Sequence, residues 1–173
     1  DDFDENQITD PNAVGDADNF ADITDISDYY DYLVSTAREI TNGEELQSGA
    51  NGLLKINKGV TLQGAYNFDQ PTTLIVTGGA SVDIMDDVTI EGQNFFGVIV
   101  LDGNINISDE VETLQGAYLA EDTDGSGNDG KFIERQLTSP KVESQLTVDG
   151  MLAGDVNDLL EQRNFIGTSP DAP

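Results

Sequence analysis

Residues 74–79 read Leu74-Ile75-Val76-Thr77-Gly78-Gly79, and the alternating segment Val82-Asp83-Ile84 follows them. The same order of an apolar run, a glycine corner and a second apolar segment returns at residues 98–107 and 145–156. Short runs rich in Val, Ile and Leu predict β-strands, and the glycines between them predict tight corners. The pattern therefore predicts a chain that turns sharply after each strand.

The corners recur at a regular spacing. Gly79 and Gly103 are 24 residues apart, and Gly150 follows after a further 47, close to two such steps. The hexapeptide Thr61-Leu62-Gln63-Gly64-Ala65-Tyr66 also returns unchanged at residues 113–118. Repeats of this length built from short strands are typical of a β-solenoid, whose stacked coils bury a continuous apolar column. We predict a mainly β protein, a short β-solenoid (β-helix) of about five coils; a β-sandwich or jelly roll is the alternative.

The chain is predicted to have four parts. Residues 1–21 form an acidic arm, and residues 22–43 form one amphipathic helix with apolar residues at three- and four-residue steps, which would cap the solenoid. Residues 44–166 form the β-solenoid domain and residues 167–173 a tail. We expect the arm to contact a neighbouring subunit through the assembly residues Phe3, Gln7, Ile8 and Thr9.

Composition excludes several functions. The chain has 173 residues with 34 acids against 7 bases, a net charge of -27, and no Cys, His or Trp. Nucleic-acid binding needs clustered Lys and Arg, and no apolar run is long enough to insert into a membrane. Without thiols or imidazoles, we predict no catalytic residue and no enzyme. Such acidity suits either high salt or a calcium-rich exterior, and both explanations stay open.

One loop has the spacing of a calcium site. Residues 122–130 alternate short oxygen-bearing side chains with glycine, as loops that bind hard cations do, although the bidentate acid of an EF-hand is displaced by one position. A flexible polar loop is the alternative. Ca²⁺ is the predicted cofactor, with these ligands: Asp122, Asp124, Ser126, Asn128, Asp129 and Glu134.

Three weaker candidates follow from the sequence. Two acidic clusters near predicted corners are secondary metal sites, with solvated corners as the alternative, and they comprise Asp83, Asp86 and Asp87, and Asp109, Glu110 and Glu112. Asn106-Ile107-Ser108 matches an N-glycosylation sequon.

The chain begins at Asp1 rather than Met, so we expect a processed, secreted chain located outside the cell or at its surface.

Residues 98–163 resemble β-helical secreted and cell-surface proteins of small-genome bacteria. The resemblance rests on residues 98–107, on Leu114-Gln115-Gly116-Ala117-Tyr118-Leu119-Ala120 and on residues 145–153. It implies a surface protein with no assigned enzymatic activity. Residues 146–156 also look similar to one coil of the bactofilins, which implies that such a stack can polymerise end to end.

These observations predict a structural protein that assembles head to tail with itself into an extracellular filament, sheath or surface layer, stabilised by calcium. The alternative is an adhesin or tail-fibre module that binds glycan or a host surface. An adhesin would need exposed aromatics along one face. Tyr66 and Tyr118 occupy equivalent places in the repeat, but core or corner packing is the simpler expectation for them.

Overall fold

The computed structural model describes residues 26–135 and 145–163. The chain divides into two compact units, residues 1–36 and 37–173. In the first unit, helix α2 (Ile26–Thr36) is described. The predicted arm at 1–21, its assembly residues and the tail at 167–173 lie outside the described residues.

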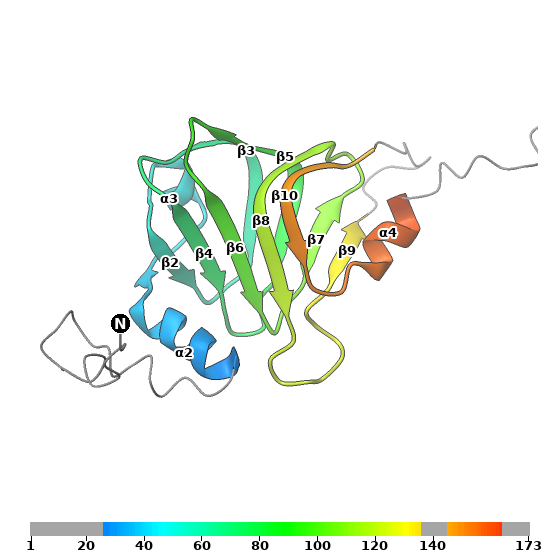
Figure 1. Ribbon diagram of the computed structural model, residues 1–173, viewed down its shortest axis with the longest axis horizontal. Helices are drawn as coiled ribbons and strands as arrows, with labels where there is room; N and C mark the ends of the chain where they lie inside the picture. Colours follow the sequence, from blue (N-terminus) through cyan, green and yellow to red (C-terminus); the bar gives the residue numbers. More distant parts are fainter. Residues whose placement is uncertain (1–25, 136–144, 164–173) are drawn as a thin grey trace, which may run out of the picture. The chain divides into compact units, whose positions relative to one another are not determined.

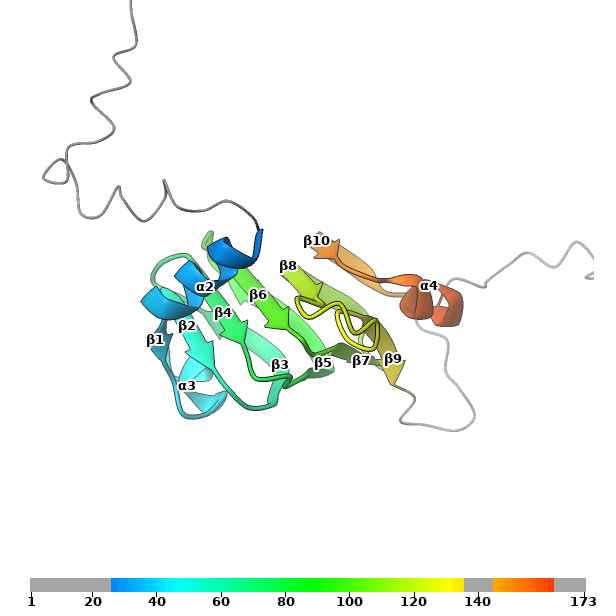
Figure 2. The same ribbon diagram turned by 90° about the horizontal axis from the view of Figure 1, so that it is seen from below.

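The second unit is a β-solenoid, as predicted. Its first side stacks five parallel strands, which lie side by side in Figures 1 and 2: β2 (Leu53–Ile56), β4 (Thr72–Val76), β6 (Phe96–Leu101), β8 (Thr113–Glu121) and β10 (Thr147–Ala153). Strand β1 (Arg38–Glu39) pairs with β2 at one end. Residues paired along this side are 20, 24, 20 and 34 positions apart: Leu54, Leu74, Val98, Tyr118 and Leu152.

The remaining sides are also parallel. Strand β3 (Val60–Asn67) pairs with β5 (Val82–Glu91), β5 with β7 (Ile105–Ser108), and β7 with β9 (Phe132–Arg135). Because these pairs are all parallel, the antiparallel sandwich or jelly roll does not occur. The solenoid has about three turns rather than five. Strand β8 pairs with both β5 and β6, so this one strand contributes to two sides.

The core is a column of inward-facing side chains. Along β2, β4 and β6 every second residue belongs to it, as with Leu74 and Val76. Three aromatic rings, those of Tyr66, Phe68 and Phe96, stack within the column with centroids 5.1–5.8 Å apart. Tyr118 meets Phe96 edge to face at 6.5 Å. Each large apolar side chain buried in this way contributes roughly 1.5–3 kcal/mol. Both tyrosines of the repeat, Tyr66 and Tyr118, are therefore core residues, which agrees with the expectation of core or corner packing.

The predicted helix over 22–43 is too long. Helix α2 ends at Thr36, and residues 38–39 form β1 in the solenoid unit. The apolar spacing misled because Ile40, which continues the helical pattern, is buried in the solenoid core. Its role as a cap stays a prediction.

Short helices close both ends of the core. Helix α3 (Glu44–Gln47) contacts β3, and helix α4 (Asn157–Arg163) contacts β9 (Figure 1). The start of α3 is held by Asn42, whose side-chain oxygen accepts from the Glu45 N–H at 3.2 Å. Leu46 of α3 and Leu159 of α4 both belong to the core cluster. The solenoid thus has an apolar plug at either end.

Candidate functional site

An acidic cluster lies where β6 and β8 end. Leu101 and Glu121 are paired in register, so Asp102 and Asp122 leave adjacent coils at the same corner. Carboxylate oxygens of Asp102, Asp122 and Asp124 lie within 4.8 Å of one another. Within the described residues this is the one group of three acids close enough to share a cation. The two stacked strands therefore create the cluster.

Asp102 holds the start of the loop that follows β8. Its Oδ1 accepts from the Thr123 backbone N–H at 2.7 Å and from the Asp124 N–H at 3.2 Å. The Thr123 hydroxyl donates to the same carboxylate at 2.7 and 2.8 Å. The backbone of Asp102 has a positive φ of 57°, a conformation that Asp tolerates better than most residues. Asp102 thereby ties one coil to the next through the loop.

Backbone donors also surround the other two carboxylates. The N–H groups of Gly127 and Ser126 donate to Asp122, and the Ser126 N–H donates to Asp124 at 2.7 Å. The hydrogen bond from the Gly127 N–H is the main cause that lowers the pKa of Asp122 below its usual value. These donors keep Asp122 ionised and offset part of the repulsion among the three carboxylates.

The cluster has the chemistry of a hard-cation site. Ca²⁺ takes six to eight oxygen ligands, which carboxylates, backbone carbonyls and water provide in flexible arrangements. Three carboxylates from Asp102, Asp122 and Asp124 would supply the charge. Backbone carbonyls of the same loop and water would supply the rest.

The predicted calcium ligands are divided by the structure. Asp122 and Asp124 are brought together, whereas Asp129 and Glu134 are not part of the acidic cluster. Ser126 and Asn128 stabilise the turn, because the Asn128 N–H donates to the Ser126 hydroxyl at 3.2 Å. Asp102 is absent from the predicted set. The register between β6 and β8 places Asp102 beside Asp122 through a step of 20 residues, whereas the glycine corners of the sequence indicated a step of 24.

The secondary acidic clusters are dispersed into separate interactions. Asp83 forms an ion pair with Arg135 at 3.4 Å and accepts from the Asn106 amide at 2.8 Å. Asp87 accepts from the N–H groups of Glu112 and Thr113, and so holds the start of β8. The Asp86 carboxylate accepts from the Asp87 N–H, and the Glu110 N–H donates to the Ser108 hydroxyl. Asp109 is buried. Neither cluster brings three acids together within the described residues.

The asparagine of the predicted glycosylation sequon takes part in a contact between coils. Asn106 lies inside β7, between the buried residues Ile105 and Ile107. Its side-chain nitrogen, to which a glycan would be attached, donates to Asp83. An acceptor sequon is expected on a surface loop rather than within a strand.

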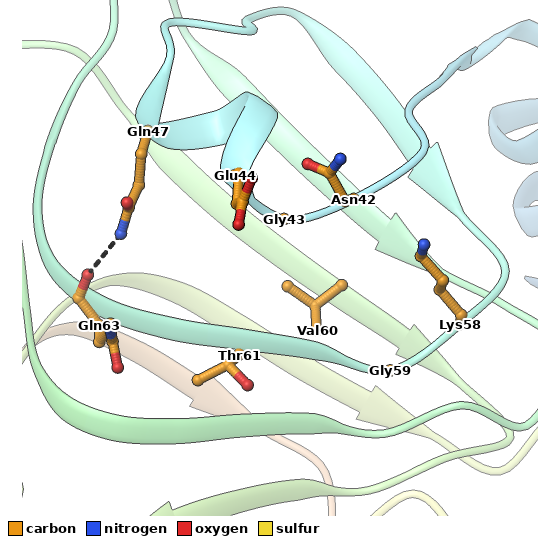
Figure 3. A pocket seen from close by; sticks show the side chains of 9 residues that line it. All are labelled: Asn42, Gly43, Glu44, Gln47, Lys58, Gly59, Val60, Thr61 and Gln63. Carbon is orange, nitrogen blue, oxygen red and sulfur yellow. Dashed lines mark hydrogen bonds between the residues drawn. The ribbon is translucent and has the colours of Figure 1, made fainter.

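A polar pocket of about 540 Å³ lies between α3 and β3 (Figure 3). Gln47 of α3 donates from Nε2 to the Gln63 carbonyl at 3.3 Å and closes one end of it. The other polar side chains in its lining include both signs of charge, from Glu44 and Lys58. Its β3 wall is formed by Val60, Thr61 and Gln63.

No helix in the described ranges has the length and apolar character needed to cross a bilayer. Comparisons with family models, with curated proteins and with solved structures found nothing that matches this chain.

Proposed function

We propose that this chain is a non-catalytic structural subunit that joins copies of itself head to tail into an extracellular filament, sheath or surface layer. One observation carries the proposal. Strand β10 pairs on one side with β8 over seven residues, and no strand of the described part pairs with its other side. An edge strand of this length is a template for pairing with another chain.

The outer edge of β10 has groups that can pair. The Thr147 N–H donates inward to the Glu112 carbonyl at 2.8 Å. Since successive residues in a parallel strand direct their N–H groups to opposite sides, the Val148 N–H faces outward. Asp149 is the single charged residue in the strand, and Met151 is 55% exposed. The edge therefore lacks the dense charge that usually protects such strands from pairing.

A complementary edge lies at the other end. Strand β3 pairs with β5, and no strand of the described part adds to its opposite side. Because all strands run parallel, β10 of one copy could add to β3 of the next without reversing direction. A contact between two different surfaces does not close on itself, so it generates an open fibre.

The joint would depend on hydrogen bonds more than on apolar contact, because Leu46 and Leu159 close the core at both ends. It must also overcome repulsion between subunits that each have a net charge of -27. Calcium bound by Asp102, Asp122 and Asp124, or high salt, would reduce this repulsion. The predicted arm at 1–21 would add contacts to the neighbour.

Electron microscopy of the full chain, with millimolar calcium and with a chelator, tests the function. We expect filaments or layers with a regular axial repeat in calcium and fewer or none in chelator. Dispersed particles under both conditions, and also in high salt, would rule out the structural function.

A proline variant tests whether β10 forms the joint. Val148→Pro removes the outward N–H while leaving the bond from the Thr147 N–H to the Glu112 carbonyl. Val148→Ala is the matched control that keeps the N–H. We expect Val148→Pro to abolish filaments and Val148→Ala to retain them, with thermal unfolding confirming that both variants fold. Equal assembly by the two variants would exclude the β10 edge as the joint.

A further inference from the structure

A shallow groove of about 280 Å³ lies at the corner that joins β5 to β6. Its walls come from three successive coils, and its lining includes Gln93, Asn94, Phe95, Gln115 and Asp149. The groove is separate from the acidic cluster and from the polar pocket beside α3. Phe96 and Ile90 also line the groove and belong to or pack against the core, whereas none of the lining residues belongs to the acidic cluster.

Phe95 is an exception among the described aromatic residues of the solenoid unit. Its side chain is 51% exposed, whereas the other described aromatic residues of the second unit, Tyr66, Phe68, Phe96, Tyr118 and Phe132, are at most 1% exposed. The ring lies against Gly97 of β6, where an added Cβ would meet its Cε1 at 3.0 Å. Because Gly97 has no side chain, the ring can pack on its backbone while remaining half exposed to solvent. An exposed phenyl ring over a groove favours a ligand that has an apolar face.

A carboxylate is held beside this ring. Gln115 accepts the Ile90 N–H on Oε1 at 2.7 Å and donates from Nε2 to Asp149 Oδ2 at 3.3 Å. Both hydrogen-bonding ends of the amide are thereby used, so its orientation is set by neighbouring coils. Among the described residues, no hydrogen bond to Asp149 Oδ1 occurs. This oxygen is therefore left as an acceptor for a hydroxyl of the ligand.

We propose that this groove binds one pyranose unit of a neutral glycan. A pyranose has a face of C–H groups that packs on a phenyl ring and hydroxyls around its rim that donate to a carboxylate. The exposed Gln93 side chain adds an amide with both a donor and an acceptor. Asp149 and the net charge of -27 disfavour an anionic sugar. The volume, below the range of about 300–1,000 Å³ usual for whole-ligand pockets, suits a single unit of a longer chain.

Isothermal titration calorimetry on the full chain tests the proposal. The probes are neutral tetrasaccharides of β-linked glucose, β-linked N-acetylglucosamine, β-linked galactose and α-linked mannose, each at millimolar concentration. We expect at least one tetrasaccharide to bind. Phe95→Ala should weaken the binding of that tetrasaccharide at least about tenfold, whereas Phe95→Tyr should retain it. Asp149→Asn should weaken binding less, because an amide oxygen still accepts a hydrogen bond.

Two results would overturn the proposal. One is the absence of binding by all four tetrasaccharides. The other is binding that Phe95→Ala leaves unchanged, which would place the saccharide elsewhere on the protein. Tetramethylammonium is the control ligand, since a ring beside a carboxylate also suits a cation. Its binding without that of any saccharide would assign the groove to cations. Because Asp149 lies in β10, the strand proposed as the joint, the titrations are done in chelator, where the chain is expected to be dispersed. A failure to bind saccharide then contradicts the groove proposal alone and leaves the proposed assembly to the electron microscopy.

Discussion

Gly64 and Gly116 have the same local role although their surroundings in the folded protein differ. They occupy the same place in the repeated hexapeptide, and both have positive φ, of 78° and 116°. In each copy the tyrosine two residues later bonds back to the glutamine that precedes the glycine. Tyr66 Oη accepts from the Gln63 N–H, and Tyr118 Oη donates to the Gln115 carbonyl. Both copies of the hexapeptide therefore share a positive-φ glycine and a hydrogen bond between the tyrosine and the glutamine.

Alanine substitutions at these two glycines should differ in how much they destabilise the protein, because the two sites have different neighbours. A Cβ at Gly64 meets nothing within 4 Å, so Gly64→Ala should cost about 1–2 kcal/mol from backbone strain alone. At Gly116 the Cβ would lie 2.6 Å from the Phe96 carbonyl oxygen. Gly116→Ala should therefore lower the free energy of unfolding by clearly more, measured by urea titration. Equal losses would mean that the close approach to β6 is relaxed at little cost.

Asp102 decides whether the acidic cluster is a calcium site. If it binds Ca²⁺, millimolar calcium should raise the unfolding temperature of the native chain. Asp102→Asn should remove most of this rise, because it takes away one of three charges. Asp86→Asn is the control, since Asp86 lies outside the cluster and should keep the full effect. A rise of the same size in Asp102→Asn would place calcium elsewhere.

At the scale of elements, the two short helices matter more than their length indicates. Helices of four and seven residues have little stability of their own, and packing holds them in place. Their contribution is the leucine that each adds to the end of the core. This explains why α3 was absent from the sequence prediction. Only a tertiary contact makes so short a segment helical.

Neighbouring leucines in α4 provide a matched test of the C-terminal plug. Leu159 is 2% exposed and Leu160 is 47% exposed. Leu159→Ala should destabilise the solenoid by about 2–5 kcal/mol because it leaves a cavity at the end of the core. Leu160→Ala should change the free energy of unfolding by no more than about 0.5 kcal/mol. Chemical denaturation measures both, and similar values would show that α4 does not close the core.

At the scale of the whole molecule, charge opposes both folding and assembly. With 34 acids and 7 bases, self-repulsion destabilises the compact state, and salt screens it over about 10 Å at 0.1 M. The unfolding temperature should therefore rise as sodium chloride increases, without any calcium. Differential scanning calorimetry over a salt series measures this. A flat response would mean that the carboxylates are already far enough apart for solvent to screen them.

Alkaline pH should destabilise the protein through its core tyrosines. Burial is the main cause that raises the pKa of both Tyr66 and Tyr118 above the ordinary value of 10.0. Above about pH 10 the unfolded chain releases these protons while the folded chain retains them, so stability is complete below this pH and falls above it. The slope is about 1.4 kcal/mol per pH unit for each tyrosine. Urea titrations should show a smaller slope in the double variant Tyr66→Phe and Tyr118→Phe, and an unchanged slope would contradict this cause.

The sequence by itself determined the order of short strands and corners, the alternation of buried residues and the bends at the glycines. It also determined that Asp122 and Asp124 lie in one polar loop. These depend on neighbours a few positions apart, which periodicity and turn chemistry describe. Only the tertiary structure decided which residues stack between coils. The steps between stacked residues are unequal. A step of 20 residues between β6 and β8 brings Asp102 to Asp122, and steps of 23 and 27 residues along β5, β7 and β9 bring Asp83 to Arg135. Tyr66 stacks beside β5 and Tyr118 beside β6, so the two copies of the hexapeptide lie on different sides. Register between coils is set by how side chains fill the shared core, and local spacing does not contain that information.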